Sequence, residues 1–104
     1  MSNQELIQAV KAIVLRFDPN AQVILYGSRA RGDAQLDSDW NFLVLLDREK
    51  AREIDRDIHE ALYTLELDAG EVLSAIIRTK GQWDTPLVRA TPFHRFVTPE
   101  GIPV

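Results

Sequence analysis

The sequence contains no cysteine, which excludes a disulfide framework, a thiolate metal site and a thiol nucleophile. It also lacks an apolar run long enough to cross a membrane. The first residues, Met1 to Leu6, do not have the basic and then apolar pattern of a secretory signal. These absences lead us to expect a cytoplasmic protein with no membrane contact.

A strong excess of positive charge is absent as well, because the formal net charge is −4. Sequence-independent binding of nucleic acid depends on a basic surface, so nucleic acid is not expected as a partner. The 104 residues have the composition of an ordinary folded domain and suffice for one sheet with a few helices. We therefore predict a single domain over residues 1–104.

Two long helices are predicted from hydrophobic periodicity. Ser2 or Asn3 can cap the first, and the turn-forming residues 18–20 end it. Its apolar stripe consists of Leu6, Val10, Ile13, Val14 and Phe17. The second is predicted to begin after Asp47 and to end near Leu65. Its apolar stripe consists of Ile54, Ile58, Leu62 and Leu65, and its polar faces include Arg48, Lys50, Arg52, Asp55, Arg56, Asp57 and Glu60.

Three strands are predicted at residues 23–26, 40–46 and 71–77. The second of these is continuously apolar, which is typical of a central strand. Between the first two strands, we expect a short helical turn at 28–31 and a polar loop at 32–38. Strands interleaved with helices indicate an α/β or α+β fold.

The last segment, residues 78–104, has weak periodicity. Residues 79–82 are predicted as a loop and parts of 83–97 as helix, while Pro99, Gly101 and Pro103 indicate an irregular end. Its large apolar side chains are Trp83, Leu87, Val88, Phe93, Phe96 and Val97. They are expected to cover the sheet or, alternatively, to form a surface for self-association or for a protein partner.

Residues suited to phosphate and metal chemistry lie where the first two strands meet the polar segment between them. Gly27 allows close backbone approach, and Ser28 offers a hydroxyl and an amide at a helix start that favours an anion. Asp39 and Asn41 point to the same face of an extended strand. Their oxygen atoms suit a hard cation such as Mg2+. The pattern indicates a phosphate-binding turn that faces a metal-binding strand, as in a nucleotide enzyme.

The spacing of these residues resembles a known motif. Gly27-Ser28, ten residues and then Asp39-x-Asn41 are similar to the Gly-Ser-x10-Asp-x-Asp signature of the minimal nucleotidyltransferases. These are small members of the polymerase-beta and kanamycin nucleotidyltransferase superfamily. The motif continues to match at Arg29, Ala30, Arg31, Gly32 and Ser38. The resemblance covers residues 23–77, and residues 78–104 are expected to complete the domain. One departure is that Asn41 replaces the second Asp.

The resemblance implies the nucleotidyltransferase fold, a small mixed sheet with helices mainly on one face. It also implies that Gly27 and Ser28 bind the terminal phosphates of a triphosphate, with Arg29 and Arg31 as further phosphate or partner contacts. Two Mg2+ ions would be held by Asp39, by Asn41 and by a third carboxylate on the next strand. We choose Glu71 as the third ligand because it opens the predicted strand on a face that alternation can direct toward Asp39, with Glu66 and Asp68 as weaker alternatives.

Three functions are compatible with the sequence, and the third requires the spacing between Gly27-Ser28 and Asp39 to be accidental. The first is Mg2+-dependent transfer of a nucleotide, AMP from ATP, to a hydroxyl acceptor, as in antitoxins that modify a HEPN-domain toxin. The second is a catalytically weakened or inactive module that binds a nucleotide or a toxin, which the neutral side chain of Asn41 favours. The third is an unrelated phosphate-binding α/β domain. A homodimer is a further interpretation of the apolar tail.

Overall fold

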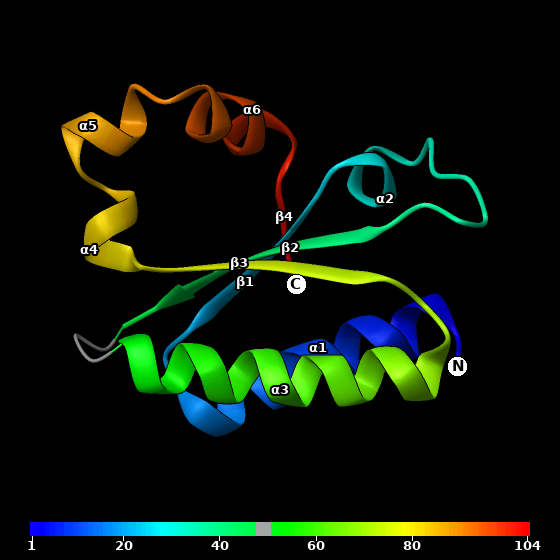
Figure 1. Cartoon of the computed structure of the whole chain (residues 1–104). Helices are drawn as coiled ribbons and strands as arrows, with labels where there is room; N and C mark the ends of the chain where they lie inside the picture. The colour runs from blue at the N-terminus through cyan, green and yellow to red at the C-terminus, as the bar shows by residue number, and fades with distance from the viewer. Residues whose placement is uncertain (48–50) are drawn as a thin grey trace.

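A four-stranded sheet lies between two groups of helices in the computed structural model, which describes residues 1–47 and 51–104 (Figure 1). The strand order is β3-β2-β1-β4. The bounds are Gln22–Tyr26 for β1, Trp40–Leu46 for β2, Leu73–Thr79 for β3 and Ile102–Pro103 for β4. β1 is antiparallel to β2 and β4, whereas β2 and β3 are parallel. The sheet is therefore mixed, which confirms the predicted fold class.

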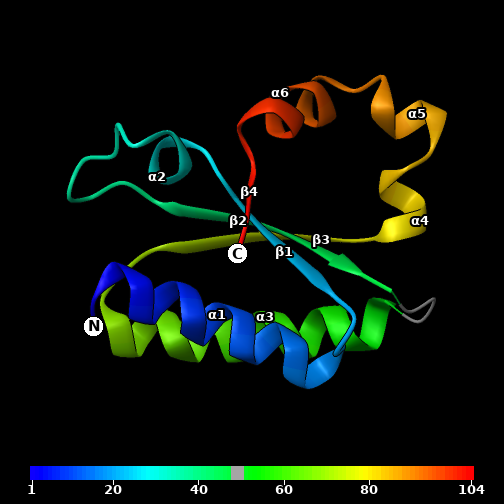
Figure 2. The same ribbon diagram turned by 180° about the vertical axis from the view of Figure 1, so that it is seen from behind.

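The two long helices, α1 (Asn3–Phe17) and α3 (Ala51–Ala69), lie along one face of the sheet (Figure 2). The side chain of Ser2 caps α1 through a hydrogen bond from the Glu5 amide, as predicted. Between these helices and the sheet lies the main core, formed by Leu6, Val10, Val14, Val23, Leu25, Trp40, Phe42, Val44, Leu46, Ile58, Leu62, Leu65 and Ile77. Each large apolar side chain buried there contributes about 1.5–3 kcal/mol, so this face supplies most of the stability.

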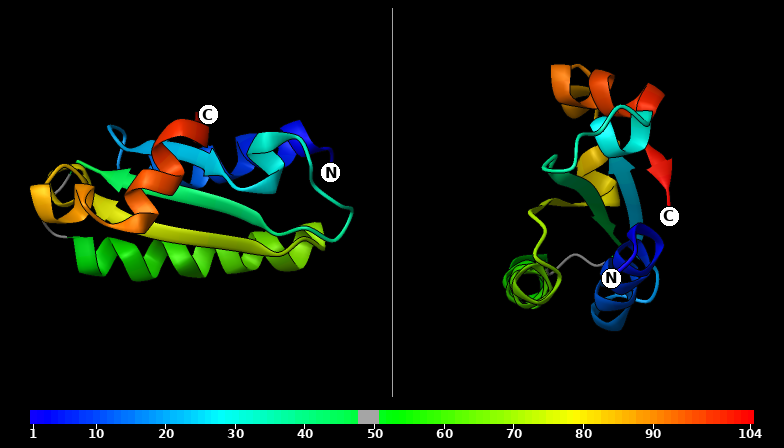
Figure 3. Two further views of the ribbon diagram at one scale, coloured as in Figure 1. Left: turned by 90° about the horizontal axis from the view of Figure 1, so that it is seen from above. Right: turned by 90° about the vertical axis from the view of Figure 1, so that its right-hand side faces the viewer.

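Shorter helices lie over the opposite face. They are α2 (Ser28–Arg31), α4 (Lys80–Trp83), α5 (Pro86–Arg89) and α6 (Pro92–Glu100), and Figure 3 shows them on the side of the sheet away from α1 and α3. A smaller cluster of buried residues forms here from Tyr26, Leu43, Leu45 and Val97, with Trp83 and Phe93 packed against it. The tail thus covers the sheet, although Leu87 and Phe96 remain exposed. The prediction of helices mainly on one face holds for the two long helices, whereas the short helices cover the other face.

Several predicted bounds need correction around the end of α3. The helix continues past Leu65 to Ala69, and the Gly70 amide still bonds to the Glu66 carbonyl oxygen at 3.0 Å. The Glu66 side chain accepts a hydrogen bond from the Leu73 amide at 2.8 Å, so it caps the start of β3. For this reason β3 begins at Leu73 and not at Glu71. The predicted start of this helix, with Arg48 and Lys50, lies outside the described residues.

The tail also differs from its prediction. Residues 79–82 are not a loop, because Thr79 and Gln82 form a reciprocal cap that starts α4. The end of the chain is not irregular either, since α6 reaches Glu100 and β4 then pairs with β1. The Val104 amide extends this pairing by donating to the Val23 carbonyl oxygen at 3.0 Å. Within the described residues, no helix combines the length and the apolar character needed to span a membrane.

Candidate functional site

The turn after β1 is built around Gly27. Its backbone has φ 82° and ψ −160°, a conformation that is essentially restricted to glycine. The Gly27 carbonyl oxygen accepts hydrogen bonds from the amides of Ala30 and Arg31, which close the short helix α2. A Cβ atom at position 27 would lie 2.7 Å from Nδ2 of Asn41. The absence of a side chain therefore allows the turn to contact β2.

Asn41 lies on the face of β2 opposite the main core. It is paired with Tyr26 of β1 and with Ser74 of β3. Its neighbours Trp40 and Phe42 point into the core beneath α1 and α3, where their exposed fractions are 2% and 1%. Asp39 immediately precedes β2 and is exposed, and strand alternation continued by one residue would direct it to the same face as Asn41. The structure thus brings Gly27 and Asn41 together, while the position of Asp39 within the site stays a prediction.

Glu71 is not placed as the sequence predicted. It precedes β3, and its carboxylate forms an ion pair with Arg29 at 3.9 Å. β3 itself contains no Asp or Glu, and the β3 residue paired with Asn41 is Ser74. Alternation had suggested that Glu71 faces Asp39, but Leu73 and Ala75 pack against the main core on the opposite side. A role for Glu71 as third metal ligand stays a prediction.

Arg29 supports the loop that leads to Asp39. Its side chain is only 11% exposed, and its guanidinium carbon lies 4.6 Å from the centre of the Trp40 ring. The guanidinium donates to the carbonyl oxygen of Ser38 at 3.1 Å and to that of Leu36 at 3.3 Å. These contacts fix the approach to β2, and a direct contact of Arg29 with phosphate stays a prediction.

Arg31 meets a residue that the sequence did not single out. Its guanidinium bonds to Oε2 of Glu100 at 3.1 Å and to Asp33 at 3.3 Å. The same Oε2 atom of Glu100 accepts a hydrogen bond from the Gly27 amide at 2.8 Å. The only signal in the sequence was an acidic residue in the tail, and Glu100 is 73 residues from Gly27.

Two titratable side chains near the turn have shifted pKa values. The hydrogen bond to Asp33 raises the pKa of Arg31, and the charges of Asp33 and Glu100 act in the same direction. Burial raises the pKa of Tyr26, the last residue of β1. Near neutral pH the turn therefore carries a charged guanidinium and a neutral phenol.

A family model described as a nucleotidyltransferase domain matches residues 5–95, including the Gly27 turn, Asp39 and Asn41. The chain belongs to this nucleotidyltransferase domain family. The assignment agrees with the resemblance drawn from the motif and implies nucleotidyl transfer with a nucleotide substrate. Among curated proteins, no match to the chain was found.

Nucleotidyltransferase domains generally use divalent metal ions, and the residues present fit this requirement only in part. Asp39, just before β2, has a carboxylate and Asn41, within β2, has an amide oxygen, and both are ligand types suited to a hard cation. In the part of the chain that the structure describes, no three side chains of His, Cys, Asp or Glu are grouped to hold a metal ion. The carboxylate set expected for two ions is therefore incomplete.

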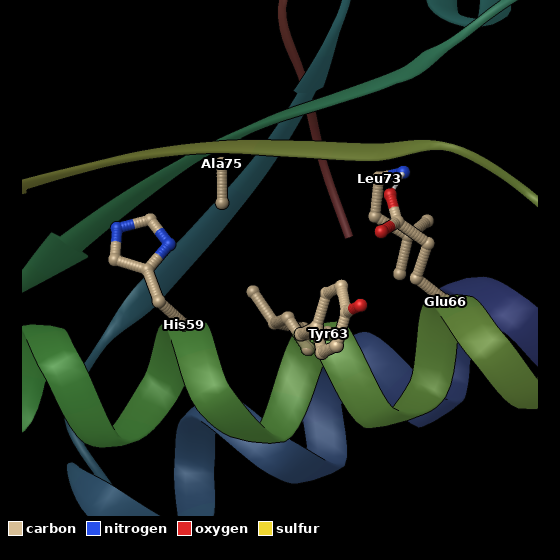
Figure 4. Close-up of a pocket in the computed structure, with 6 residues that line it drawn as sticks. His59, Tyr63, Glu66, Leu73 and Ala75 are labelled. Atoms are coloured by element: carbon tan, nitrogen blue, oxygen red, sulfur yellow. Dashed lines mark hydrogen bonds between the residues drawn. The ribbon is translucent and has the colours of Figure 1, made fainter.

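A separate pocket of about 180 Å3 lies between α3 and β3, on the main-core side of the sheet (Figure 4). It is lined by His59, Leu62, Tyr63, Glu66, Leu73 and Ala75. His59 pairs with Asp55 on the same helix at 2.9 Å, and Glu66 caps β3. Because Leu73 and Ala75 point away from the Asn41 face, this pocket is distinct from the nucleotidyltransferase motif.

Proposed function

We propose that this nucleotidyltransferase domain binds a nucleoside triphosphate, ATP, with Mg2+ and transfers AMP to a hydroxyl group of a separate protein. The supporting observation is the contact between the two halves of the motif. Gly27 brings the phosphate-binding turn against Asn41, so a triphosphate on the turn would lie beside the oxygen atoms of β2. The reacting phosphate would then lie near Asp39, which is two residues before Asn41 in the sequence.

The reaction is a substitution at the alpha-phosphorus. The acceptor oxygen forms a bond to this atom, the bond to the bridging oxygen breaks, and pyrophosphate leaves with the electron pair while the hydroxyl proton passes to water. Mg2+ bound by Asp39 and Asn41 would polarise the phosphate and offset the charge of the leaving group. The Ser28 hydroxyl would donate a hydrogen bond to the terminal phosphates. Gly27 would allow the backbone to approach them.

The acceptor that we propose is a HEPN-domain toxin, for which this protein would act as the antitoxin. Two large apolar side chains of the tail are available for a protein contact, because Leu87 is 81% and Phe96 is 51% exposed. Arg95 and Arg78 are exposed in the same part of the chain and could attract an acidic partner. A homodimer through the tail is the alternative use of this surface.

A second candidate is a module that binds a nucleotide or a toxin and has lost catalysis. Two observations favour it: Asn41 is neutral, and β3 has Ser74 where a carboxylate could have faced Asn41. Losing an anionic ligand removes several kcal/mol of metal-based transition-state stabilisation, and about 1.4 kcal/mol changes a rate tenfold. Label transfer from ATP to a candidate partner distinguishes a slow enzyme from a binding module.

Replacing Ser28 by Ala tests the phosphate contact. Mg2+ and ATP should raise the melting temperature of the wild-type protein, because a ligand that binds the folded state stabilises it. Ser28→Ala should bind about tenfold more weakly, since a hydrogen bond to a charged group contributes about 1.5–3 kcal/mol. The measurement is a thermal titration with Mg2+ and ATP. Thr64→Ala, which removes an exposed hydroxyl from α3, is the matched control. Equal shifts in both variants would exclude Ser28 from the site.

Replacing Asp39 by Ala tests the metal site. Asp39 is exposed, so the metal-free stability should change by no more than about 0.5 kcal/mol. The Mg2+-dependent part of ATP binding should disappear, because Asp39 is the charged member of the donor pair. Asp37→Ala removes an exposed acid from the same loop and should keep the Mg2+ response. If Asp39→Ala unfolds the protein while its folded fraction responds normally to Mg2+, Asp39 has a structural role.

A further inference from the structure

The Glu100 carboxylate accepts hydrogen bonds from two donors at the Gly27 turn. Oε2 accepts a hydrogen bond from the Gly27 amide at 2.8 Å and another from Arg31 at 3.1 Å. The Glu100 side chain is 15% exposed, so the contact is largely shielded from water. Glu100 also lies outside residues 5–95, the range that the family model matches. The structure therefore contains an anion of its own at the turn where the proposed function requires a phosphate.

The position of this carboxylate depends on how the chain continues after Glu100. A Cβ atom on Gly101 would lie 2.7 Å from Cγ2 of Ile24 and 3.0 Å from the Val97 carbonyl oxygen. The lack of a side chain thus lets the backbone pack tightly against β1, to which β4 is paired. The backbone at Glu100 is held by α6 before it and by β4 after it. The Glu100 side chain can therefore rotate away from Gly27 while β4 stays in the sheet.

The Glu100 carboxylate is held by two hydrogen-bond donors at the turn. α2 has four residues, so its dipole adds little, and the contacts are one amide and one guanidinium. A phosphate that binds here must first break the two hydrogen bonds of Glu100. A single phosphate group would replace them with a similar number. A polyphosphate gains additional contacts along its length, for example at Ser28.

We propose that Glu100 is a resident anion of the nucleotide site, which a polyphosphate chain must displace in order to bind. This inference rests on the proposed function and extends it. Glu100 sets a threshold for occupancy of the site, because the loss of its two bonds is subtracted from the affinity of every competing anion. Ligands with one phosphate group then bind poorly, and the site is reserved for di- and triphosphates.

The test uses inorganic tripolyphosphate with Mg2+ as the probe and titration calorimetry of the full chain as the measurement. Glu100→Gln keeps the shape of the side chain and removes its charge, which weakens the bonds to Gly27 and Arg31. Its affinity for tripolyphosphate should exceed that of the wild-type protein about tenfold. Asp33→Asn is the matched control, because Asp33 pairs with Arg31 at 3.3 Å and has no hydrogen bond to Gly27. It should change the affinity less than threefold.

The outcomes separate this inference from the proposed function. If Glu100→Gln binds tripolyphosphate no more tightly than Asp33→Asn, Glu100 does not occupy the site and the inference is overturned. Weaker binding in Glu100→Gln would overturn it too and would indicate that Glu100 holds the metal ion. If the expected tenfold gain is seen while no label passes from ATP, Glu100 is the resident anion and the transfer reaction is wrong. If no variant binds tripolyphosphate, both proposals are overturned.

Discussion

Replacing Asn41 by Asp is expected to raise nucleotide transfer by about two orders of magnitude. The substitution restores a negative charge next to Asp39, where a divalent cation would bind. A metal contact of this kind is worth several kcal/mol in the transition state, and about 3 kcal/mol corresponds to roughly a hundredfold in rate. Asn and Asp are almost equal in size, so the contact with Gly27 should be retained.

The stability of Asn41→Asp should depend on Mg2+. Without the metal, the new carboxylate is close to Asp39 and to the turn that holds Glu100, and crowding of like charges should lower the melting temperature. With Mg2+ the order should reverse, so that the variant becomes the more stable protein. The paired measurement is thermal unfolding with and without Mg2+, together with label transfer from ATP to the candidate partner.

A second substitution shows whether the gain comes from the metal pair. Asn41→Asp combined with Asp39→Asn has the same net charge as the wild-type protein but lacks the paired carboxylates, and the gain in transfer should vanish. If Asn41→Asp itself gains neither a Mg2+ response nor label transfer, more than this residue has been lost, and the missing carboxylate on β3 is the evident reason. The module that only binds would then be the better assignment.

Replacing Gly27 by Ala is expected to destabilise the protein by about 3 kcal/mol, because a backbone conformation restricted to glycine costs about 1–3 kcal/mol for other residues. The added Cβ would also lie 2.7 Å from the Asn41 side chain. A loss of this size lowers the melting temperature by more than about 10 °C in a domain of this length. The response to Mg2+ and ATP should disappear, since the turn and β2 could no longer be in contact.

Gly32→Ala is the control for this experiment. Gly32 also has a positive φ of 85°, but its ψ of 11° places it in the left-handed helical region. A Cβ atom there would have nothing within 4 Å, so only the conformational cost of about 1–2 kcal/mol remains. Thermal unfolding of both variants gives the comparison. Equal losses of stability would mean that close packing of Gly27 against Asn41 is not required.

The sequence was most informative where one local signal decided the structure. β2 has the predicted bounds because a run that is apolar except for Asn41 is flanked by polar residues. The boundary between α3 and β3 was misplaced because the apolar stripe of the helix ends at Leu65, which suggested that the helix itself ends there. In the structure Glu66 stays in the helix and caps β3 through the Leu73 amide, a contact that local propensity does not reveal.

For the candidate site too, the sequence predicted features that depend on local signals and missed those that depend on long-range contacts. Gly27 and Asn41 lie close together, because Gly27 follows the end of β1 and Asn41 is paired with Tyr26, the last residue of that strand. Glu71 was chosen by alternation from a strand that in fact begins later, so the reasoning failed with the boundary. Glu100 reaches Gly27 only because β4 returns to the edge of β1, and such a long-range pairing has no local signal.

The unequal faces of the sheet have a consequence for how this protein can change over generations. Asn41 lies on the face of β2 opposite the main core, and Asp39 lies just before the strand, so substitutions at either position leave the packing beneath α1 and α3 untouched. Selection for a stable fold therefore does not protect the chemistry on the opposite face. Proteins of this kind can lose activity through a substitution such as Asp to Asn at position 41 and regain it through the reverse substitution. Both forms stay folded, so no loss of stability opposes either change.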